Sequence, residues 1–585
     1  MKIQNHYNLA ALMAILLATL AIVFPSVSSA VVVTSAADNL PLQPLITGTL
    51  RHAIATAPTN DTITFSNSLK GKTIILKAGQ LVVDRKLTIQ GPGLERLSVS
   101  GANSSRVFYV TGSGTSGAPA VIISGLTITK GNGTGLSITD GGAIYNNGFL
   151  KLLRCAVTNS KAAGSGGGIF NAGTLSEVTE CTIAYNAAVA DGGGVCDTQD
   201  MLIQRCAIFS NTAGGSGGGF QETGTSTLIN CTIACNTAIG SGGGINDGGG
   251  ATIDIYNCTI SGNTASIGGG LAIPGFGAST TLRNTIIAGN NPSGPPTPAP
   301  DVSDVFIDGT SGILISMGNN LIGTTTGAAP GSFLPSDQLN VNPKLGPLKD
   351  NGGTTLTMEL LPGSPAIDTG SNSNVLASMT TDQRTTFNRI INGTVDVGAF
   401  EYIAPRVLKN GALADLSSCV AGPCNSETAR DLRKAIRSIQ KSLCPSLWVD
   451  DSHLTKCGEL VFEFEEQAVE ALLDIVEDGG PCALNAQNAI DDLVLADELL
   501  ARIAIDAAVA GGGIPKYICS AQANLAKGLN ALAKGKFHQA MDFYEHAWID
   551  AQHALGKKCG CDDDDERGER ERRDREDRDR HGDDD

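Results

Sequence analysis

The residues that could do chemistry in this sequence form a column of acidic side chains that recurs about every 25 residues. Glycine triplets repeat along the chain, and the residue two positions after the apolar residue that closes each triplet is acidic at Asp197, Glu222 and Asp247. The same position is Asn146 and Asn171 in the two earlier repeats. Stacked strands lie about 4.8 Å apart, so three carboxylates in register would repel one another.

Three arrangements would relieve that repulsion. The acids could extend into water beside an asparagine-type turn ladder, which is the arrangement we expect. They could instead bind a cation such as calcium, since carboxylate oxygens are the ligands that calcium prefers. They could also serve as acid–base catalysts with raised pKa values. The cation column of Asp197, Glu222 and Asp247 is therefore the metal site that the sequence offers.

A second set of polar residues lies near the C-terminus. Asp542, His546, Asp550 and His553 are spaced by four, four and three residues, which places them on one face of a helix. Such a set could bind a metal ion. A solvated polar face is the commoner role for this pattern, and it is the one we expect.

The sequence contains few of the residues expected in a polysaccharide-degrading enzyme. Glycosidases need paired carboxylates, and lyases need a base near a positively charged group. Between residues 31 and 404 the sequence has one histidine, His52, and the basic residues in its repeats are few, among them Arg154, Lys161, Arg205 and Arg283. We therefore expect no catalytic residues and no resident cofactor. An enzyme remains the alternative, with its site on loops around residues 290–340, where prolines interrupt the repeat.

The elements that position these residues are short repeats. The triplets begin at Gly166, Gly192, Gly217, Gly242 and Gly268, and a related Gly-Gly-Ala begins at Gly141. Two further columns run in phase: Cys155, Cys181, Cys206, Cys231 and Cys258, followed by Thr285; and Ser160, Asn186, Asn211, Asn236, Asn263 and Asn290. A unit this short must stack on its neighbours to bury an apolar face. The sequence predicts a parallel β-helix with rungs of about 25 residues, in which the cysteines are buried thiols acting as small apolar residues.

Motifs at both ends of this region resemble a known group. Thr49-Leu-Arg51-His-Ala53-Ile54, followed by the strand-like residues 61–65, resembles the cap and first strand of exported right-handed β-helix proteins of the pectin-lyase-like superfamily. The glycine-rich rungs resemble polymorphic outer-membrane-protein-type repeats. The segments 342–368, Thr381-Asp382-Gln383-Arg384 and 396–401 resemble the closing region of choice-of-anchor Q proteins. The resemblance implies a mainly β fold, a right-handed single-stranded parallel β-helix.

The chain divides into five predicted segments. Residues 1–30 read as a signal peptide, with Lys2, an apolar stretch over residues 9–24 and small residues up to Ala30. An uncleaved membrane anchor is the alternative. An N-terminal cap (31–58), the β-helix (59–404), an α-helical Cys-rich domain (405–561) and a disordered charged tail (562–585) follow. We expect an exported protein, secreted, periplasmic or on the cell surface, with no membrane span after signal cleavage.

The helical domain contains eight of the 15 cysteines. In an exported protein, an even number suggests up to four disulfides, and a zinc site is the alternative. The spacing of apolar residues predicts a helix that begins at Ser426 and further helices near 458–478, 485–509, 517–534 and 536–555. Residues 531–548 resemble part of a tetratricopeptide-type hairpin, which suggests a protein partner for this domain.

Composition and charge restrict the function. The net charge is −17 and 41% of the residues are hydrophobic. A nucleic-acid partner is not expected, because no cationic footprint is present. We expect a non-enzymatic secreted or cell-surface protein that serves in adhesion, glycan contact or envelope scaffolding, with polysaccharide or cell-envelope components as partners. The alternatives are a polysaccharide lyase or glycoside hydrolase and a calcium-dependent structural module.

Overall fold

The structure is a computed structural model, and it describes residues 30–111, 121–173, 176–275, 277–292, 303–308, 311–326, 331–391, 393–420 and 426–557. The predicted signal peptide, the predicted charged tail, Cys424, Cys559 and Cys561 fall outside these residues, except that Ala30 is described. The chain forms two compact units that meet between Tyr402 and Ile403. Each unit is described by itself below.

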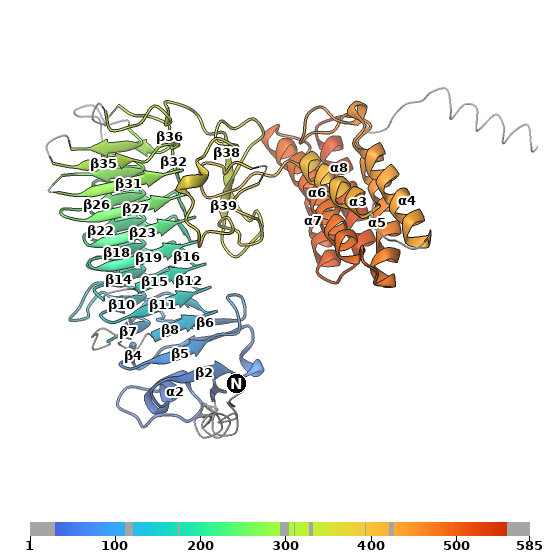
Figure 1. The fold of residues 1–585 in the computed structure, drawn as a ribbon. Coiled ribbons are helices and arrows are strands. Elements are labelled where there is room, and N and C mark those ends of the chain that lie inside the picture. Colours follow the sequence, from blue (N-terminus) through green and yellow to red (C-terminus); the bar gives the residue numbers. More distant parts are fainter. Residues whose placement is uncertain are drawn as a thin grey trace, which may run out of the picture. The chain divides into compact units, whose positions relative to one another are not determined.

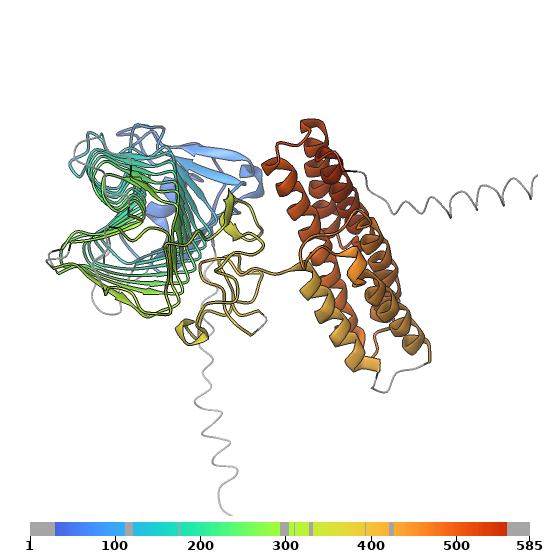
Figure 2. The ribbon, with the colours of Figure 1, turned by 90° about the horizontal axis from the view of Figure 1, so that it is seen from above.

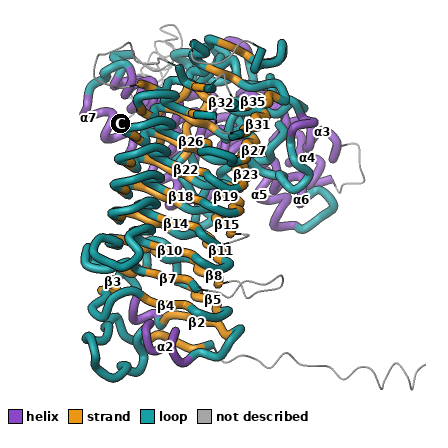
Figure 3. Tube along the Cα trace, turned by 90° about the vertical axis from the view of Figure 1, so that its left-hand side faces the viewer, coloured by secondary structure: helices purple, strands orange, loops and turns teal. Residues whose placement is uncertain are grey.

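The first unit is built from parallel sheets in which successive repeats stack as rungs (Figures 1 and 3). The first sheet contains β1 (Val31–Val33), β2 (Asp61–Phe65), β5 (Leu87–Gln90), β8 (Val121–Ser124), β11 (Leu150–Leu153), β15 (Ser176–Thr179), β19 (Asp200–Gln204), β23 (Thr225–Ile229), β27 (Thr252–Tyr256), β31 (Ser279–Arg283) and β35 (Ile313–Ser316). The second contains β3 (Lys72–Ile75), β6 (Leu97–Ser100), β9 (Thr127–Thr129), β12 (Ala156–Thr158), β16 (Thr182–Ala184), β20 (Ala207–Phe209), β24 (Thr232–Ala234), β28 (Thr259–Ser261), β32 (Ile286–Ile287), β36 (Leu321–Ile322) and β37 (Gln338–Leu339).

Two further sheets complete the rungs. The third contains β4 (Leu81–Val83), β7 (Phe108–Val110), β10 (Ile144–Asn146), β14 (Ile169–Asn171), β18 (Val195–Asp197), β22 (Phe220–Glu222), β26 (Ile245–Asp247), β30 (Leu271–Ile273) and β34 (Val305–Ile307). The fourth contains β13 (Lys161–Ala162), β17 (Ala187–Ala188), β21 (Thr212–Ala213), β25 (Thr237–Ala238), β29 (Thr264–Ala265) and β33 (Asn291–Pro292). Each residue pairs with its counterpart in the next repeat, as Ile169 does with Val195. The predicted parallel β-helix is confirmed.

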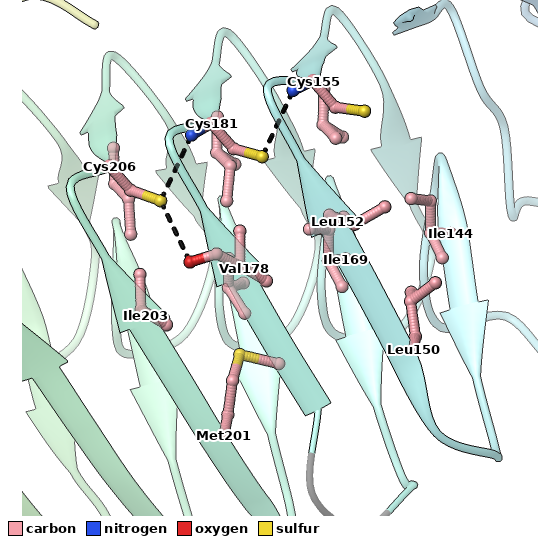
Figure 4. Close-up of a cluster of buried hydrophobic side chains, with 14 of the residues drawn as sticks. Ile144, Leu150, Leu152, Cys155, Ile169, Val178, Cys181, Met201, Ile203 and Cys206 are labelled. Atoms are coloured by element: carbon pink, nitrogen blue, oxygen red, sulfur yellow. Dashed lines mark hydrogen bonds between the residues drawn. The ribbon is translucent and has the colours of Figure 1, made fainter. Parts of the chain in front are cut away.

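The interior of the β-helix is built from columns of identical or similar residues. Cys155, Cys181, Cys206, Cys231 and Cys258 are completely buried. The backbone N–H of each cysteine donates to the Sγ of the next, at 3.3 Å from Cys155 to Cys181 and 3.4 Å from Cys181 to Cys206 (Figure 4). The predicted stack of buried thiols is therefore confirmed.

A second interior column consists of asparagines. Asn211 donates from its backbone N–H and from Nδ2 to Asn236 Oδ1, each at 3.0 Å, and Asn186 makes the same two bonds to Asn211. The column ends at Asp304, whose Oδ1 accepts both donors of Asn290. Each rung is thereby aligned on the next by side chain as well as by backbone.

The glycine triplets supply turns that no other residue fits. The first glycine of each triplet is left-handed, as at Gly166 with φ +68, which is a conformation that costs glycine little. At Gly167, a Cβ atom would lie 2.4 Å from the backbone of Ala187 in the next rung. The close stacking of turns therefore requires glycine at both positions.

The N-terminal end is closed by α2 (Leu50–Thr56). Thr49 caps this helix by accepting the N–H of His52, and Leu50, Ala53 and Ile54 are buried against the first rungs. A short 3₁₀ helix, η1 (Asn67–Leu69), follows β2. The predicted cap helix and first strand are confirmed, although β1 already pairs with β2 inside the segment assigned to the cap.

The last part of the first unit leaves the rungs and runs along the second sheet. We call residues 341–402 the strap; it contains the antiparallel pair β38 (Leu345–Lys349) and β39 (Thr357–Leu360) and the 3₁₀ helix η2 (Asn372–Asn374). Strap residues pack on the outer side of the second sheet: Leu360, Val397 and Phe400 cluster with Ile286 and Leu321. The rungs therefore end at β37, whereas the sequence predicted β-helix up to residue 404.

The second unit is all-helical (Figure 2). It contains α3 (Pro405–Val420), α4 (Ser426–Ser442), η3 (Pro445–Leu447), α5 (Glu459–Asp478), α6 (Ala483–Ala510), α7 (Pro515–Leu532) and α8 (Phe537–Ala554). Five of the α-helices were predicted; α3 was not, although its buried residues follow a helical spacing of four, three, four and three. Cys444 and Cys519 are exposed thiols, so the framework of up to four disulfides is not formed in full. In the described residues of both units, no helix is long and apolar enough to cross a membrane.

Candidate functional site

The acid column lies at the ends of successive strands of the third sheet. Asn146, Asn171, Asp197, Glu222 and Asp247 are the last residues of β10, β14, β18, β22 and β26. The strand register pairs each of them with the next. The predicted stacking of the three acids is therefore present in the structure.

The acids point into the β-helix. Asp197, Glu222 and Asp247 are each 0% exposed, as are Asn146 and Asn171. The expectation that these acids extend into water was wrong. Side chains two positions apart on a strand share a face, and the residue two positions before each acid is an interior residue such as Val195. The acids therefore share the interior face with the apolar core.

The N-terminal part of the column forms a continuous line of hydrogen bonds. Asn146 Nδ2 donates to Asn171 Oδ1 at 2.6 Å, and Asn171 Nδ2 donates to Asp197 Oδ1 at 2.6 Å. Asp197 also accepts from Ser226 Oγ at 3.0 Å and from the backbone N–H of Gln199 at 3.2 Å. Both oxygens of Asp197 are thus hydrogen-bonded.

Glu222 and Asp247 have fewer donors. Glu222 Oε1 accepts the backbone N–H of Gly224 at 2.5 Å, and Asp247 Oδ2 accepts Thr280 Oγ1 at 2.6 Å. Their other oxygens, Glu222 Oε2 and Asp247 Oδ1, are buried and receive no hydrogen bond from the described residues. A buried oxygen without a donor is costly when it is charged.

The pKa values follow from this burial. Burial, together with the neighbouring Asp197, raises the pKa of Glu222 to about 9. Burial raises the pKa of Asp247 to about 7 and also raises that of Asp197. Because solvent does not reach these groups, a polymeric substrate does not reach them either. Among the described residues, no group of three or more His, Cys, Asp or Glu side chains is arranged to hold a metal ion.

Two open grooves on the surface of the first unit are lined by described residues. The first-sheet groove has a volume of about 380 Å³ and crosses several rungs; it is lined by Phe149, Ser176, Glu177, Asp200, Met201, Leu202, Thr225 and Thr227. Its lining combines apolar side chains, hydroxyl groups and the two acids Glu177 and Asp200. This mixture provides both apolar contact and hydrogen-bonding groups to an extended ligand.

The second groove, of about 650 Å³, lies between the turns that follow the first sheet and the strap. Glu95, Arg96 and Arg154 are exposed in it, and Gly353 and Thr354 of the strap close one side. Arg154 donates to Glu180 at 2.7 Å. This groove places an acid close to basic side chains at the surface.

Comparison with known proteins agrees with this architecture. Residues 107–291 match a family model described as a right handed beta helix region. This part of the chain is a right-handed β-helix. No curated protein and no solved structure matches the chain significantly. The fold implied by the resemblance to the pectin-lyase-like superfamily is thus confirmed, while the resemblances to choice-of-anchor Q proteins and to polymorphic outer-membrane-protein-type repeats stay predictions.

The other predicted site residues do not converge. In the right-handed β-helix, His52 lies in the cap helix and Arg283 pairs with Asp254 at 2.9 Å. In the helical unit, His546 Nδ1 lies 2.6 Å from the carbonyl oxygen of Asp542, whereas Asp550 accepts Asn524 Nδ2 and His553 packs beside Tyr517. These α8 residues form a polar surface. Of the 290–340 stretch, residues 293–302, 309–310 and 327–330 lie outside the described residues.

Sequence reasoning missed two buried ionic clusters. In the helical unit, Lys409 contacts Glu465 and also Asp497, the latter at 2.9 Å, and all three side chains are 0% exposed. In the strap, Arg384 pairs with Asp382 at 2.6 Å between the rings of Phe387 and Phe400. Lys409 occupies a position of the buried stripe of α3 that also includes Ala412 and Leu416. A charged residue at an apolar stripe position was the available signal.

Proposed function

We propose that this protein is an exported, non-catalytic right-handed β-helix protein that contacts polysaccharide or other cell-envelope components through the first-sheet groove. The observation that carries the proposal is the position of the acids. Asp197, Glu222 and Asp247, the stacked acids with raised pKa values, are sealed inside the β-helix, where they serve the fold. A catalytic pair would need to meet its substrate in a cleft.

The first-sheet groove carries one exposed acid, Asp200, and suits a neutral rather than an acidic glycan. Glu177 is paired with Lys151 at 2.5 Å, so these two charges offset each other beside the groove. Leu202 and Phe149 provide half-buried apolar surface, and Thr225 and Thr227 provide hydroxyl groups. Export, suggested by residues 1–30, would bring this face to a cell envelope or its surroundings.

Binding to immobilised neutral and acidic polysaccharides, with release of reducing ends assayed in parallel, tests the proposal. Thr227→Arg places a long cation in the groove and is expected to weaken binding at least tenfold. Thr62→Arg is the matched control, because Thr62 is a half-buried residue of β2 in the same outward column but outside the groove. Equal binding by both variants would show that the polysaccharide contacts another face of the protein. No binding to any polymer would remove the glycan proposal.

A polysaccharide lyase is the second candidate, and the groove that contains Glu95, Arg96 and Arg154 favours it. A base beside positive groups is the combination that a lyase needs to remove a proton next to a carboxylate. Formation of unsaturated products from a uronate polymer, with and without calcium, would support this candidate over the non-catalytic one.

A further inference from the structure

Two buried oxygens of the right-handed β-helix require an explanation. Glu222 Oε2 and Asp247 Oδ1 are enclosed, and none of the described residues donates a hydrogen bond to them. As carboxylate oxygens they would carry charge in an apolar interior, which proteins avoid unless the charge is neutralised. Glu222 is also the direct strand partner of Asp197, so two acids occupy neighbouring rungs.

The surroundings of Glu222 supply no positive charge. In the facing first sheet, Ser226 of β23 and Thr280 of β31 contribute hydroxyl groups to the column. In the third sheet, the titratable groups near Glu222 are Asp197, Asp247 and the thiol of Cys196, which itself lies near Asp191 and Asp140. No lysine, arginine or histidine of the described residues hydrogen-bonds to the three acids. A cation from this chain is therefore not what neutralises Glu222.

The arrangement of hydrogen-bond donors around Asp197 and Glu222 indicates that a proton neutralises Glu222. Asp197 has a donor on each of its oxygens and is well suited to be a carboxylate. Glu222 Oε1 already accepts a backbone N–H, which leaves Oε2 as the position for a hydrogen. We propose that Asp197 and Glu222 form a proton-binding site inside the β-helix, in which Glu222 is a neutral carboxylic acid whose Oε2–H donates to the Asp197 carboxylate.

This site makes folding take up a proton. The unfolded chain holds a glutamic acid proton with a pKa near 4.5, whereas burial and Asp197 raise the pKa of Glu222 to about 9 in the folded protein. The folded state therefore binds the proton more tightly. Its stabilising effect is complete below pH 4.5 and is lost as the pH rises toward 9. The β-helix is consequently more stable in mild acid than at alkaline pH.

The first experiment compares the full chain with Glu222→Gln across pH 5 to 8. One proton corresponds to a fall in the melting temperature of about 2 °C per pH unit for a unit of this size. The glutamine keeps a donor toward Asp197 without needing a proton. We expect Glu222→Gln to melt higher than the parent at pH 8 and to lose about one proton's worth of the pH slope, as followed by the β-sheet circular dichroism.

Asp200→Asn is the matched control. Asp200 is an exposed acid at the start of β19, the first-sheet strand that directly follows β18. It is expected to leave the slope unchanged. A second measurement does not depend on a variant that folds: the infrared spectrum of the parent protein at pH 7. We expect a carbonyl band of protonated carboxylic acid there, and the parent-minus-Glu222→Gln difference spectrum is expected to contain it.

Two results would overturn the proposal. If calcium raises the melting temperature of the parent, EDTA lowers it and Glu222→Gln abolishes both effects, a metal ion occupies the column. If the parent shows no protonated carboxyl band and Glu222→Gln retains the full pH slope, Glu222 is ionised in the folded protein.

Discussion

Each of the two units of this protein buries a pair of acids, and among the described residues only the pair in the helical unit contacts a lysine. In the β-helix, Asp197 and Glu222 stack with no cation of the described chain bonded to them. In the helical unit, Glu465 and Asp497 both contact the ammonium group of Lys409. Burial lowers the pKa of Lys409, but Asp497 and Glu465 outweigh that effect and raise it. The bundle therefore keeps a charged lysine in its core.

The difference reflects the space that each architecture offers. The rungs of the β-helix stack closely, and its cysteine and asparagine columns consist of short side chains such as Cys206 and Asn211. A proton fits such a column without changing it. In the bundle, the four-carbon chain of Lys409 reaches from α3 to acids on α5 and α6. A long side chain can cross between helices in this way, whereas the acids of the β-helix column are hydrogen-bonded to short side chains such as Asn171 and Ser226.

Removal of the lysine is expected to have the largest effect. Lys409→Met leaves Glu465 and Asp497 buried without their cation, and we expect the helical unit to lose about 3–5 kcal/mol of unfolding free energy. Denaturant titration followed by helical circular dichroism measures this loss. Lys434→Met is the matched control, because Lys434 pairs with Glu470 at an exposed site and such pairs contribute little. Equal effects of the two variants would show that the buried triad is not a stabilising unit.

A further acid placed in the interior of the β-helix would test whether a proton can neutralise a buried carboxyl group. Asn211 is completely buried and donates Nδ2 to Asn236 Oδ1 and to the carbonyl oxygen of Ile183. In Asn211→Asp, a charged oxygen would face these acceptors, so we expect a loss of about 3 kcal/mol at pH 8.

The loss should shrink at pH 4.5, where the introduced carboxyl group can take up a proton and regain a donor. Unfolding of the β-helix at the two pH values measures the difference. Asn147→Asp, at an exposed position after β10, is expected to have little effect at either pH. A loss at Asn211→Asp that is the same at both pH values would contradict neutralisation by a proton.

The smallest expected effect is at Asp247, the C-terminal acid of the column. Burial raises the pKa of Asp247 to about 7 from its ordinary 3.8. The stabilising effect of its proton is therefore complete below pH 3.8 and is lost as the pH rises through about 7. We expect Asp247→Asn to stabilise the β-helix by about 1–3 kcal/mol at pH 8 and by less at pH 5. A gain that does not depend on pH would show that Asp247 is ionised throughout this range.

Much of the fold could be predicted from the sequence, because the spacing of a repeat indicates which residues stack on one another. The spacing of the glycine triplets, the cysteines and the asparagines predicted stacked rungs, and these columns do stack. Thr49 also marked the start of the cap helix correctly. The strap was the exception. Its motif around Asp382 and Arg384 was recognised, but its course along the second sheet was not predicted. That course depends on contacts between residues far apart in sequence, such as the hydrogen bond from Asn230 Nδ2 to the carbonyl oxygen of Thr381.

The candidate site shows the same division more sharply. The sequence by itself determined that Asp197, Glu222 and Asp247 are in register, because register follows from the length of the repeat. The sequence also indicated which face of the strand the acids occupy, since each acid follows an interior residue by two positions. The tertiary structure alone decided how many donors reach each oxygen, because Ser226 and Thr280 come from the facing sheet, about a rung further along the chain. It also brought Lys409 to Glu465 and Asp497, since helix packing, unlike a repeat, sets no fixed sequence distance between the residues that meet.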